Sequence, residues 1–365
     1  MKQKKLLIFM PSIEMGGVEK NLFIISNFLS SKFDQVKFIT SSDNTQNLDK
    51  KIQIIKFKIP LLLFNKRIFK IIFSCILLIK EIIKCKNVII ISFQGNLYSI
   101  LIAKIFGVKI ITRLNSSPSG WIKNSLKKKI FSKIYSFSNL IIVNSFEFKK
   151  EIWSQFKLRS ICIYNPLNKK EIIQKAKLSI KKNPFDIKKG IKIMNIGRLV
   201  DQKDHLTLLK SINEIKNKIK VQLIIIGQGK CENLLRNYIK KKNLNKNIKI
   251  IAYKKNPYPY LNYCDLFILT SKYEGLPNVL LEAITLKKFV ISSNCPTGPK
   301  EILNNGKGGI LFKTGSYKEL AKKIILFSKN VKSNKTKIDY AFSTLKKYDD
   351  KKNLYLYLKK LKELN

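Results

Sequence analysis

Short apolar runs typical of strands alternate with helical patterns along nearly the whole chain, and this alternation restricts the possible folds more than any other feature. Residues 6–10 have the composition of a buried strand, and residues 18–30 carry apolar side chains at helical spacing. This alternation is typical of a mostly parallel sheet covered by helices. The further strands expected in the first half are 35–40, 52–59, 88–93, 109–112, 140–144 and 161–165.

A second series of the same kind begins at residue 191, after a Lys-rich segment at 168–190. Its expected strands are 191–196, 221–226, 248–251, 266–269 and 289–292, with a helix at 205–215. At 365 residues the chain is too long for one ordinary core. The sequence therefore predicts an α/β protein with two Rossmann-like domains, 1–168 and 169–345. A basic helix at 346–365 follows, and we expect it to pack back on the first domain.

The formal charge of +49 is spread over the chain, with a basic excess of 20 in residues 1–168 and of 29 in the remainder. This spread favours a solvated lysine surface, while attraction to anionic lipid or to a phosphorylated substrate remains the alternative. No RNA-binding aromatic signature and no zinc-finger spacing accompanies the charge. We therefore expect no specific nucleic-acid partner.

Residues 61–86 form the most hydrophobic region, but their longest uncharged run, 71–79, has nine residues, whereas a bilayer span needs about 20. Two interpretations remain open: a packed crossover helix or an amphipathic helix at a membrane interface. The N-terminal apolar run is too short to predict a signal peptide. Six cysteines without Cys-x-x-Cys pairs, together with a single histidine, argue against a zinc site and indicate free thiols in a reducing cytoplasm.

Two carboxylates lie eight residues apart in the segment Glu274-Gly275-Leu276-Pro277-Asn278-Val279-Leu280-Leu281-Glu282. Proline favours the first helical position, so we expect Pro277 to open a helix and Glu282 to lie about two turns into it. A helix N-terminus attracts anions, and a carboxylate can accept hydrogen bonds from both hydroxyls of a sugar diol. The segment therefore predicts a nucleotide-sugar site.

Arg198 and Lys203 follow the expected strand 191–196 in the segment Gly197-Arg198-Leu199-Val200-Asp201-Gln202-Lys203. Ligands of doubly wound folds bind beyond the carboxyl ends of the strands. Two cations at that edge would neutralise a diphosphate and stabilise its charge as it leaves.

With these motifs, the chain resembles the family-4 retaining glycosyltransferases, including bacterial enzymes of lipopolysaccharide, capsule and lipid-linked oligosaccharide synthesis. The resemblance implies the GT-B fold, in which two Rossmann-like domains with parallel sheets face each other across a cleft. It covers nearly the whole chain. It rests on Gly16-Gly17-Val18-Glu19, Gly197 through Lys203, Gly227-Gln228-Gly229, Glu274 through Glu282 and Cys295 through Glu301.

The resemblance also implies roles at matching positions. Arg198 and Lys203 would hold the donor diphosphate, Glu282 would accept the ribose hydroxyls, and Glu274 would contact the transferred sugar. The catalytic set would be Glu274, Arg198 and Lys203. The expected substrate-binding set adds Gly16 and Gly17 from the first domain, and Gly227, Gly275, Leu276, Asn278, Thr297 and Gly298 from the second. The alternative for Gly227-Gln228-Gly229 is a simple turn rather than a loop near the base.

Family members often carry a histidine on an acceptor-side loop, where this chain has Thr112-Arg113-Leu114-Asn115. We expect Arg113 or Asn115 to contact the acceptor or the sugar. The identity of a general base stays open, and none is needed if a donor phosphate oxygen takes the acceptor proton. The chain has no Asp-x-Asp motif at a strand end, so we expect neither a metal nor another cofactor.

The function expected from the sequence is transfer of a hexose or N-acetylhexosamine from a UDP-sugar to a lipid-linked or cell-surface glycan. The enzyme would act in the cytoplasm, peripherally on the inner face of an anionic membrane. A GT-B nucleotide-sugar epimerase is one alternative, although such enzymes need further acidic and histidine residues. A noncatalytic polyanion-binding protein is another, but it leaves the paired glutamates unexplained.

Overall fold

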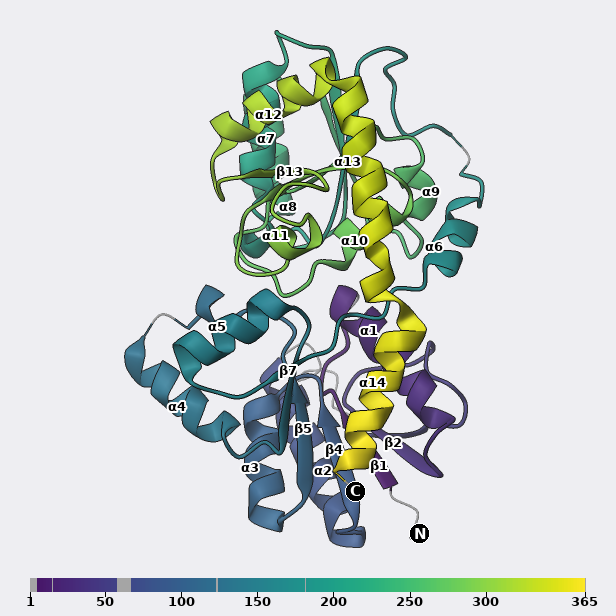
Figure 1. The fold of residues 1–365 in the computed structure, drawn as a ribbon, viewed down its shortest axis with the longest axis vertical. Coiled ribbons are helices and arrows are strands. Elements are labelled where there is room, and N and C mark those ends of the chain that lie inside the picture. Colours follow the sequence, from purple (N-terminus) through teal and green to yellow (C-terminus); the bar gives the residue numbers. More distant parts are fainter. Residues whose placement is uncertain (1–4, 15, 58–66, 123, 181, 365) are drawn as a thin grey trace. The chain divides into compact units, whose positions relative to one another are not determined.

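The computed structural model describes the chain except for residues 1–4, 15, 58–66, 123, 181 and 365. The described chain divides into two compact units, residues 1–166 with 350–365, and residues 167–349. Each unit is an α/β layer structure built on one parallel sheet (Figure 1). The prediction of two Rossmann-like domains is therefore confirmed.

Unit 1 contains a seven-stranded sheet in the order β3-β2-β1-β4-β5-β6-β7, with parallel pairing between neighbours. Central strands such as β4 are buried on both faces, which explains their continuous apolar sequences. The strands are β1 (Lys5–Phe9), β2 (Gln35–Thr40), β3 (Gln53–Lys56), β4 (Val88–Ser92), β5 (Lys109–Arg113), β6 (Leu140–Val143) and β7 (Ile161–Cys162).

Helices cover both faces of this sheet and form two cores with it. One core is closed by α2 (Arg67–Lys84), α3 (Asn96–Phe106), α4 (Ser125–Tyr135) and α5 (Phe146–Phe156), with the short turn η1 (Pro118–Gly120) before α4. The opposite core contains α1 (Gly17–Ser30) and α14 (Asp350–Glu363). In Figure 1, α3 and α4 lie on one side of β5, and α14 lies on the other.

Helix α14 joins unit 1 after the chain has passed through unit 2. Leu167 and Asp349, the first and last residues of unit 2, form a parallel bridge, so the chain enters and leaves that unit at one place. The side chain of Asn353 then accepts a hydrogen bond from the Tyr164 amide at 3.1 Å. The sequence predicted a single C-terminal helix from 346; the structure has α13 (Val331–Thr344), η3 (Leu345–Tyr348) and then α14.

Unit 2 contains a six-stranded parallel sheet in the order β10-β9-β8-β11-β12-β13. Its strands are β8 (Ile191–Ile196), β9 (Val221–Ile226), β10 (Ile248–Ile251), β11 (Leu266–Leu269), β12 (Phe289–Ser293) and β13 (Ile310–Phe312). Its helices and turns are α6 (Lys169–Ala176), η2 (Asp201–Lys203), α7 (His205–Ile215), α8 (Glu232–Lys241), α9 (Tyr258–Leu261), α10 (Asn278–Thr285), α11 (Pro299–Ile302), α12 (Tyr317–Lys329) and α13. The sequence did not predict α6 within the 168–190 segment.

Both sheets reverse their strand order once. In unit 2 the chain builds β8, β9 and β10 outward on one side, then returns to place β11 beside β8. The gap between the carboxyl ends of β8 and β11 is the switch point, where doubly wound folds bind ligands. In unit 1 the equivalent position lies between β1 and β4.

Candidate functional site

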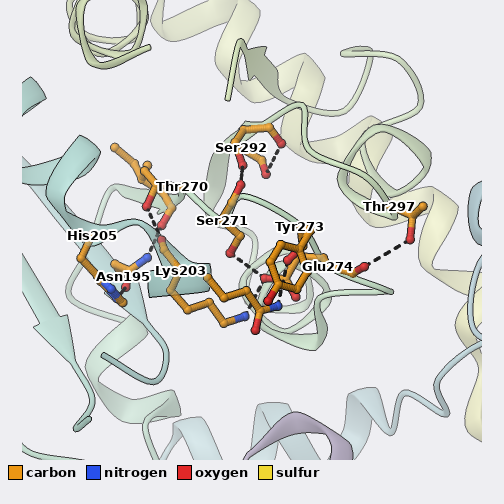
Figure 2. Close-up of polar contacts among 12 residues, drawn as sticks. Asn195, Lys203, His205, Thr270, Ser271, Tyr273, Glu274, Ser292 and Thr297 are labelled. Atoms are coloured by element: carbon orange, nitrogen blue, oxygen red, sulfur yellow. Dashed lines mark hydrogen bonds and ion pairs between the residues drawn. The ribbon is translucent and has the colours of Figure 1, made fainter. Parts of the chain in front are cut away.

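An ion pair joins the two strands that flank the switch point of unit 2. Lys203, which follows β8, places its Nζ 2.6 Å from Oε1 of Glu274, which follows β11 (Figure 2). The Ser271 hydroxyl donates to the same oxygen at 2.6 Å. Both ionic side chains are largely buried, with 17% and 9% of the side chain exposed. The sequence predicted both residues as site residues, and the structure brings them together.

Hydrogen bonds to backbone carbonyls connect the two loops that carry this ion pair. The Thr270 hydroxyl donates to the Lys203 carbonyl at 2.9 Å, and the Lys272 amide donates to the Gln202 carbonyl at 2.8 Å. The Gln202 side chain donates in turn to the Tyr273 carbonyl at 2.8 Å. These bonds tie the loop after β8 to the loop after β11, so the positions of Lys203 and Glu274 are fixed relative to each other.

Glycines allow the loops after β8 and β9 to meet. A Cβ on Gly227 would lie 1.9 Å from the Gly197 carbonyl oxygen, and one on Gly229 would lie 2.5 Å from the Leu199 carbonyl oxygen. The Leu199 amide donates to the Gln228 carbonyl at 2.9 Å. Gly227 thus has a packing role that suffices to explain it. A Cβ on Gly197 would lie 3.8 Å from the stem of Lys203, which is an ordinary van der Waals distance.

The loop after β12 lies against the Glu274 loop. The Glu274 amide donates to the Pro296 carbonyl at 2.7 Å, and the Thr297 hydroxyl donates to the Gly275 carbonyl at 3.0 Å. Gly298 has φ of 96°, and a Cβ there would lie 2.4 Å from the Gly275 carbonyl oxygen. The Thr297 side chain is therefore used to join the two loops.

The second glutamate of the motif lies on α10. This helix begins at Asn278, and Pro277 is its N-cap rather than its first residue, so Glu282 lies just over one turn into the helix instead of two. Glu282 is 6% exposed, and its Oε1 accepts a hydrogen bond from the Tyr258 hydroxyl at 3.0 Å. Tyr258, at the start of α9, was not identified from the sequence, because a tyrosine 24 residues before the glutamate carries no local signal.

The remaining predicted residues of unit 2 surround this constellation. Arg198 is exposed in the turn directly after β8. Gly275 and Leu276 lie in the turn between Glu274 and α10, and Asn278 is the first residue of that helix. The structure thus collects the predicted residues of unit 2 on the loops that follow β8, β9, β11 and β12 and on helix α10.

His205, the only histidine, lies beneath the Lys203 loop and is 2% exposed. The Asn195 amide nitrogen donates to the Ile268 carbonyl at 2.7 Å, so the Asn195 oxygen, 3.0 Å from His205 Nε2, accepts from the ring. Burial lowers the pKa of His205 to about 4, and the positive charge of Lys203 contributes. His205 is therefore neutral at pH 7 and supports the loop. Asn195, inside β8, was not identified from the sequence.

Unit 1 carries the Gly16–Gly17 loop at its own switch point. Gly16 precedes α1 in an extended conformation, and Gly17 is the first residue of the helix. A Cβ on Gly16 would lie 3.0 Å from Oε2 of Glu19, whose other oxygen accepts from the Glu14 amide at 3.3 Å. The Ser12 amide donates to the Gln94 side chain at 3.0 Å, which links the loop after β1 to the loop after β4.

The prediction for Arg113 is not consistent with its position. Arg113 is 0% exposed, and its guanidinium donates to Tyr357 at 2.6 Å, to Asn165 at 2.5 Å and to the Asn115 side-chain oxygen. Asn115 in turn donates to the Phe93 carbonyl at 2.8 Å. Two of these partners, Tyr357 and Asn165, are remote in sequence, so Arg113 holds α14 and the chain before unit 2 in place and presents no exposed surface to an acceptor.

No cluster of three or more histidine, cysteine, aspartate or glutamate side chains that could hold a metal ion occurs within the described ranges. The six cysteines form no disulfide. Burial raises the pKa of the Cys295 thiol, close to the site, to about 12, and the carboxylate of Glu274 adds to the effect. Among the described helices, none has the length and apolarity required to cross a bilayer.

Comparisons with known proteins find similarity to glycosyltransferases. Residues 168–344 match the family of glycosyl transferases group 1. An uncharacterized glycosyltransferase of Methanocaldococcus jannaschii is 34% identical over 221 residues, 56% of this chain and 53% of that protein. The Campylobacter jejuni N-acetylgalactosamine-N,N'-diacetylbacillosaminyl-diphospho-undecaprenol 4-alpha-N-acetylgalactosaminyltransferase is 27% identical, covering 84% of this chain and 86% of that protein.

Solved structures show the same fold over the full length. A glycosyltransferase from Rickettsia africae superposes with a TM-score of 0.79 at 20% identity, covering 100% of this chain and 99% of that one. The Anabaena protein HepE in complex with UDP and glucose superposes with a TM-score of 0.79 at 16% identity, covering 99% of each chain. The chain therefore has the fold of these solved structures over its full length, and its residues 168–344 are similar in sequence to the glycosyl transferases of group 1.

Proposed function

We propose that this protein is a retaining hexosyltransferase that moves a hexose or N-acetylhexosamine from a UDP-sugar to a lipid-linked glycan. The observation that carries the proposal is the Lys203–Glu274 ion pair across the switch point of unit 2, with Glu282 on the adjacent helix α10. A cation and two carboxylates in this arrangement match the three chemical parts of a nucleotide-sugar: a diphosphate, a hexose and a ribose.

The division of roles follows from charge and hydrogen bonding. Lys203 and the neighbouring Arg198 would bind the diphosphate and stabilise its charge as the bond to the sugar breaks. Glu274 would then accept from hydroxyls of the hexose, since a carboxylate can serve several donors at once. Glu282, oriented by Tyr258, would accept from the ribose hydroxyls.

A lipid-linked acceptor is supported by the relatives. The Campylobacter protein is named for transfer to a saccharide on diphospho-undecaprenol, and another relative, 27% identical over 82% of this chain, is an amylovoran biosynthesis glycosyltransferase of Erwinia amylovora. We therefore place the enzyme on the cytoplasmic face of a membrane, with a growing glycan on a polyprenyl diphosphate as acceptor.

The test is UDP release from a panel of UDP-sugars with polyprenyl-diphosphate saccharides as acceptors. Glu282→Gln and Arg198→Ala should lower acceptor-dependent release at least tenfold. The matched control is Lys218→Ala, which removes an exposed lysine paired with Glu214 in the same unit. Equal release by all variants, or nucleotide binding by none of the proteins, would exclude the proposal. The anomeric configuration of the product, read by NMR, tests retention.

The site should work without a divalent metal, because Lys203 and Arg198 supply the charge that a metal would otherwise provide. We expect acceptor-dependent UDP release to be unchanged by excess EDTA. Lys203→Gln should not be rescued by added Mg²⁺ or Mn²⁺. A loss of release in EDTA that Mg²⁺ or Mn²⁺ restores would contradict this expectation.

A further inference from the structure

The outer sides of helices α2, α3, α4 and α5 in unit 1 expose many large apolar residues. Helices α2, α3, α4 and α5 all pack on the same core beneath the sheet, and consecutive helices contact each other. Their outer sides expose large apolar residues, with Ile105 on α3 77% exposed. The exposed members of this outer face are Ile68, Ile72, Ile76 and Ile83 on α2, Tyr98, Leu101 and Ile105 on α3, Leu126 and Ile130 on α4, and Phe146 and Trp153 on α5.

The internal packing of α2 shows why its isoleucines point outward. Leu78 and Ile82 lie in the core, the Ser74 hydroxyl is 2.8 Å from that of Ser41, and Glu81 pairs with Lys37 of β2 at 2.5 Å. These residues fix one side of the helix against the sheet. The isoleucines recur at intervals of four, four and seven residues, which places them together on the other side. The helix is thus a packed crossover helix, one of the two interpretations left open by the sequence, and its outer side is apolar.

The same four helices are strongly basic. They carry eleven Lys or Arg residues and three Glu, and one of these, Glu81, is buried in ion pairs with Lys37 and Lys84. Exposed lysines lie among the apolar residues: Lys127 and Lys129 are on α4 beside Leu126 and Ile130. Apolar side chains interleaved with lysines are complementary to an anionic lipid bilayer, in which apolar acyl chains lie beneath negatively charged headgroups.

We propose that the outer face of α2, α3, α4 and α5 docks on an anionic lipid bilayer. The isoleucines would enter the boundary between headgroups and acyl chains, and the lysines would remain at the phosphate level, where long side chains reach from a buried stem. This inference deepens the proposed function by naming the membrane-binding surface, and it rests on the proposed lipid-linked acceptor only for its biological purpose. The docking itself needs neither donor nor acceptor.

The experiment is flotation of the full chain with vesicles of phosphatidylglycerol and phosphatidylcholine, without nucleotide or acceptor. The variants are Ile72→Gln/Ile76→Gln and Leu101→Gln/Ile105→Gln, which remove apolar area and leave the charge unchanged. Each pair should weaken binding about tenfold or more, from the apolar area withdrawn from the bilayer. The charge variant Lys127→Gln/Lys129→Gln should weaken binding by a similar factor, and only with anionic vesicles. Binding of the wild type should fall with salt.

The matched control is Leu234→Gln/Leu326→Gln, which changes two leucines of unit 2 that are 56% and 46% exposed. It should bind vesicles like the wild type. Circular dichroism and thermal melting of every variant identify any that fails to fold. Equal vesicle binding by the face variants and the control would overturn the proposal. A dimer in sedimentation that the isoleucine variants dissociate would also overturn it, in favour of a contact between two copies.

This experiment separates the surface from the enzymatic proposal. Vesicle binding without UDP release from any UDP-sugar would leave the docking surface standing and remove the proposed activity. UDP release that depends on a detergent-solubilised acceptor, together with no vesicle binding by the wild type, would support the proposed activity and exclude the docking surface.

Discussion

The Tyr258 hydroxyl contributes a hydrogen bond to the candidate site. It donates to Oε1 of Glu282, and both residues are buried. A hydrogen bond to a charged group contributes about 1.5–3 kcal/mol and restricts the orientations of the carboxylate. Tyr258 is therefore a positioning residue for the glutamate that we expect to bind ribose.

Replacing this tyrosine should reveal the ribose contact. We expect Tyr258→Phe to weaken UDP binding about tenfold in calorimetry, because the Glu282 carboxylate loses its orienting donor. The loss of affinity caused by Tyr258→Phe should be smaller for the deoxy analogue, 2′-deoxy-UDP or 3′-deoxy-UDP, that lacks the hydroxyl bound by Glu282. Tyr263→Phe, at a 37% exposed tyrosine of the same unit, is the control. An equal loss for UDP and for both deoxy analogues would indicate a purely structural role.

The buried histidine makes the stability of unit 2 depend on pH. Its pKa is about 4 in the folded protein and about 6.5 when unfolded, so the unfolded chain binds more protons between these values. The contribution of His205 is complete above pH 6.5 and is lost as the pH falls toward 4. Between pH 7.5 and pH 5 we expect a loss of about 2 kcal/mol in the free energy of unfolding of unit 2.

Hydrogen exchange of the β8 and β11 amides can measure this change. Tryptophan fluorescence cannot, because Trp121 and Trp153, the two tryptophans, both belong to unit 1. A His205→Gln variant should lose this part of the pH dependence while keeping a side chain that can donate to Asn195. If wild type and variant showed the same slope between pH 7.5 and pH 5, His205 would not be the titrating group.

At the scale of the elements, close backbone contacts in unit 2 require glycine in the turn after β9. Gly227→Ala would place its Cβ 1.9 Å from the Gly197 carbonyl oxygen, a backbone atom that a rotamer change cannot move. Separating the loops after β8 and β9 should cost about 3 kcal/mol or more, comparable to the larger overpacking penalties. Urea unfolding followed at unit 2 amides measures the cost.

Gly107→Ala provides the contrast. Gly107 has φ of 67°, but no atom lies within 4 Å of an added Cβ. Its penalty should be the backbone strain alone, about 1 kcal/mol. Similar penalties for the two alanine variants would show that the contact at Gly227 relaxes easily.

The strands of unit 2 also show what the sequence can predict. The bounds expected for β8, β9, β10 and β11 agree with the structure, because each run is rich in Ile, Leu, Val or Phe, and glycines directly follow β8 and β9. The three-residue strand β13 and the lysine-rich helix α12 were not predicted, since their pattern is too short or too polar. Lys203, Glu274 and Glu282 were identified because they lie in motifs. Tyr258 and Asn195 were missed, because their roles arise only from tertiary contacts.

At the scale of the whole molecule, Arg113 connects the C-terminal helix α14 to strand β5 within unit 1. Its Nε donates to Tyr357 across 244 residues of sequence. Sequence patterns gave no sign of this contact; Arg113 or Asn115 was expected at the acceptor because the two residues lie where family members often carry a histidine. Tyr357→Phe would leave a buried guanidinium nitrogen without its acceptor, so we expect unit 1 to lose about 1–3 kcal/mol of stability.

Tryptophan fluorescence during urea unfolding checks this expectation, because it reports unit 1 alone. The unit 1 midpoint should fall for Tyr357→Phe, while exchange of unit 2 amides stays unchanged. Tyr355→Phe, at a 63% exposed tyrosine of α14, should leave both unchanged. A shift in unit 2, or none in unit 1, would contradict the role assigned to this hydrogen bond.

The return of α14 to unit 1 has a consequence for how the protein is made. A ribosome synthesises residues 1–166, then all of unit 2, and only afterwards the helix that covers Ile163, Arg113 and the α1 side of the sheet. At ordinary elongation rates of about 5–20 residues per second, the first unit waits on the order of ten seconds or more for its last element. During that time the second unit can complete its core, so unit 1 begins to be synthesised before unit 2 and is completed after it.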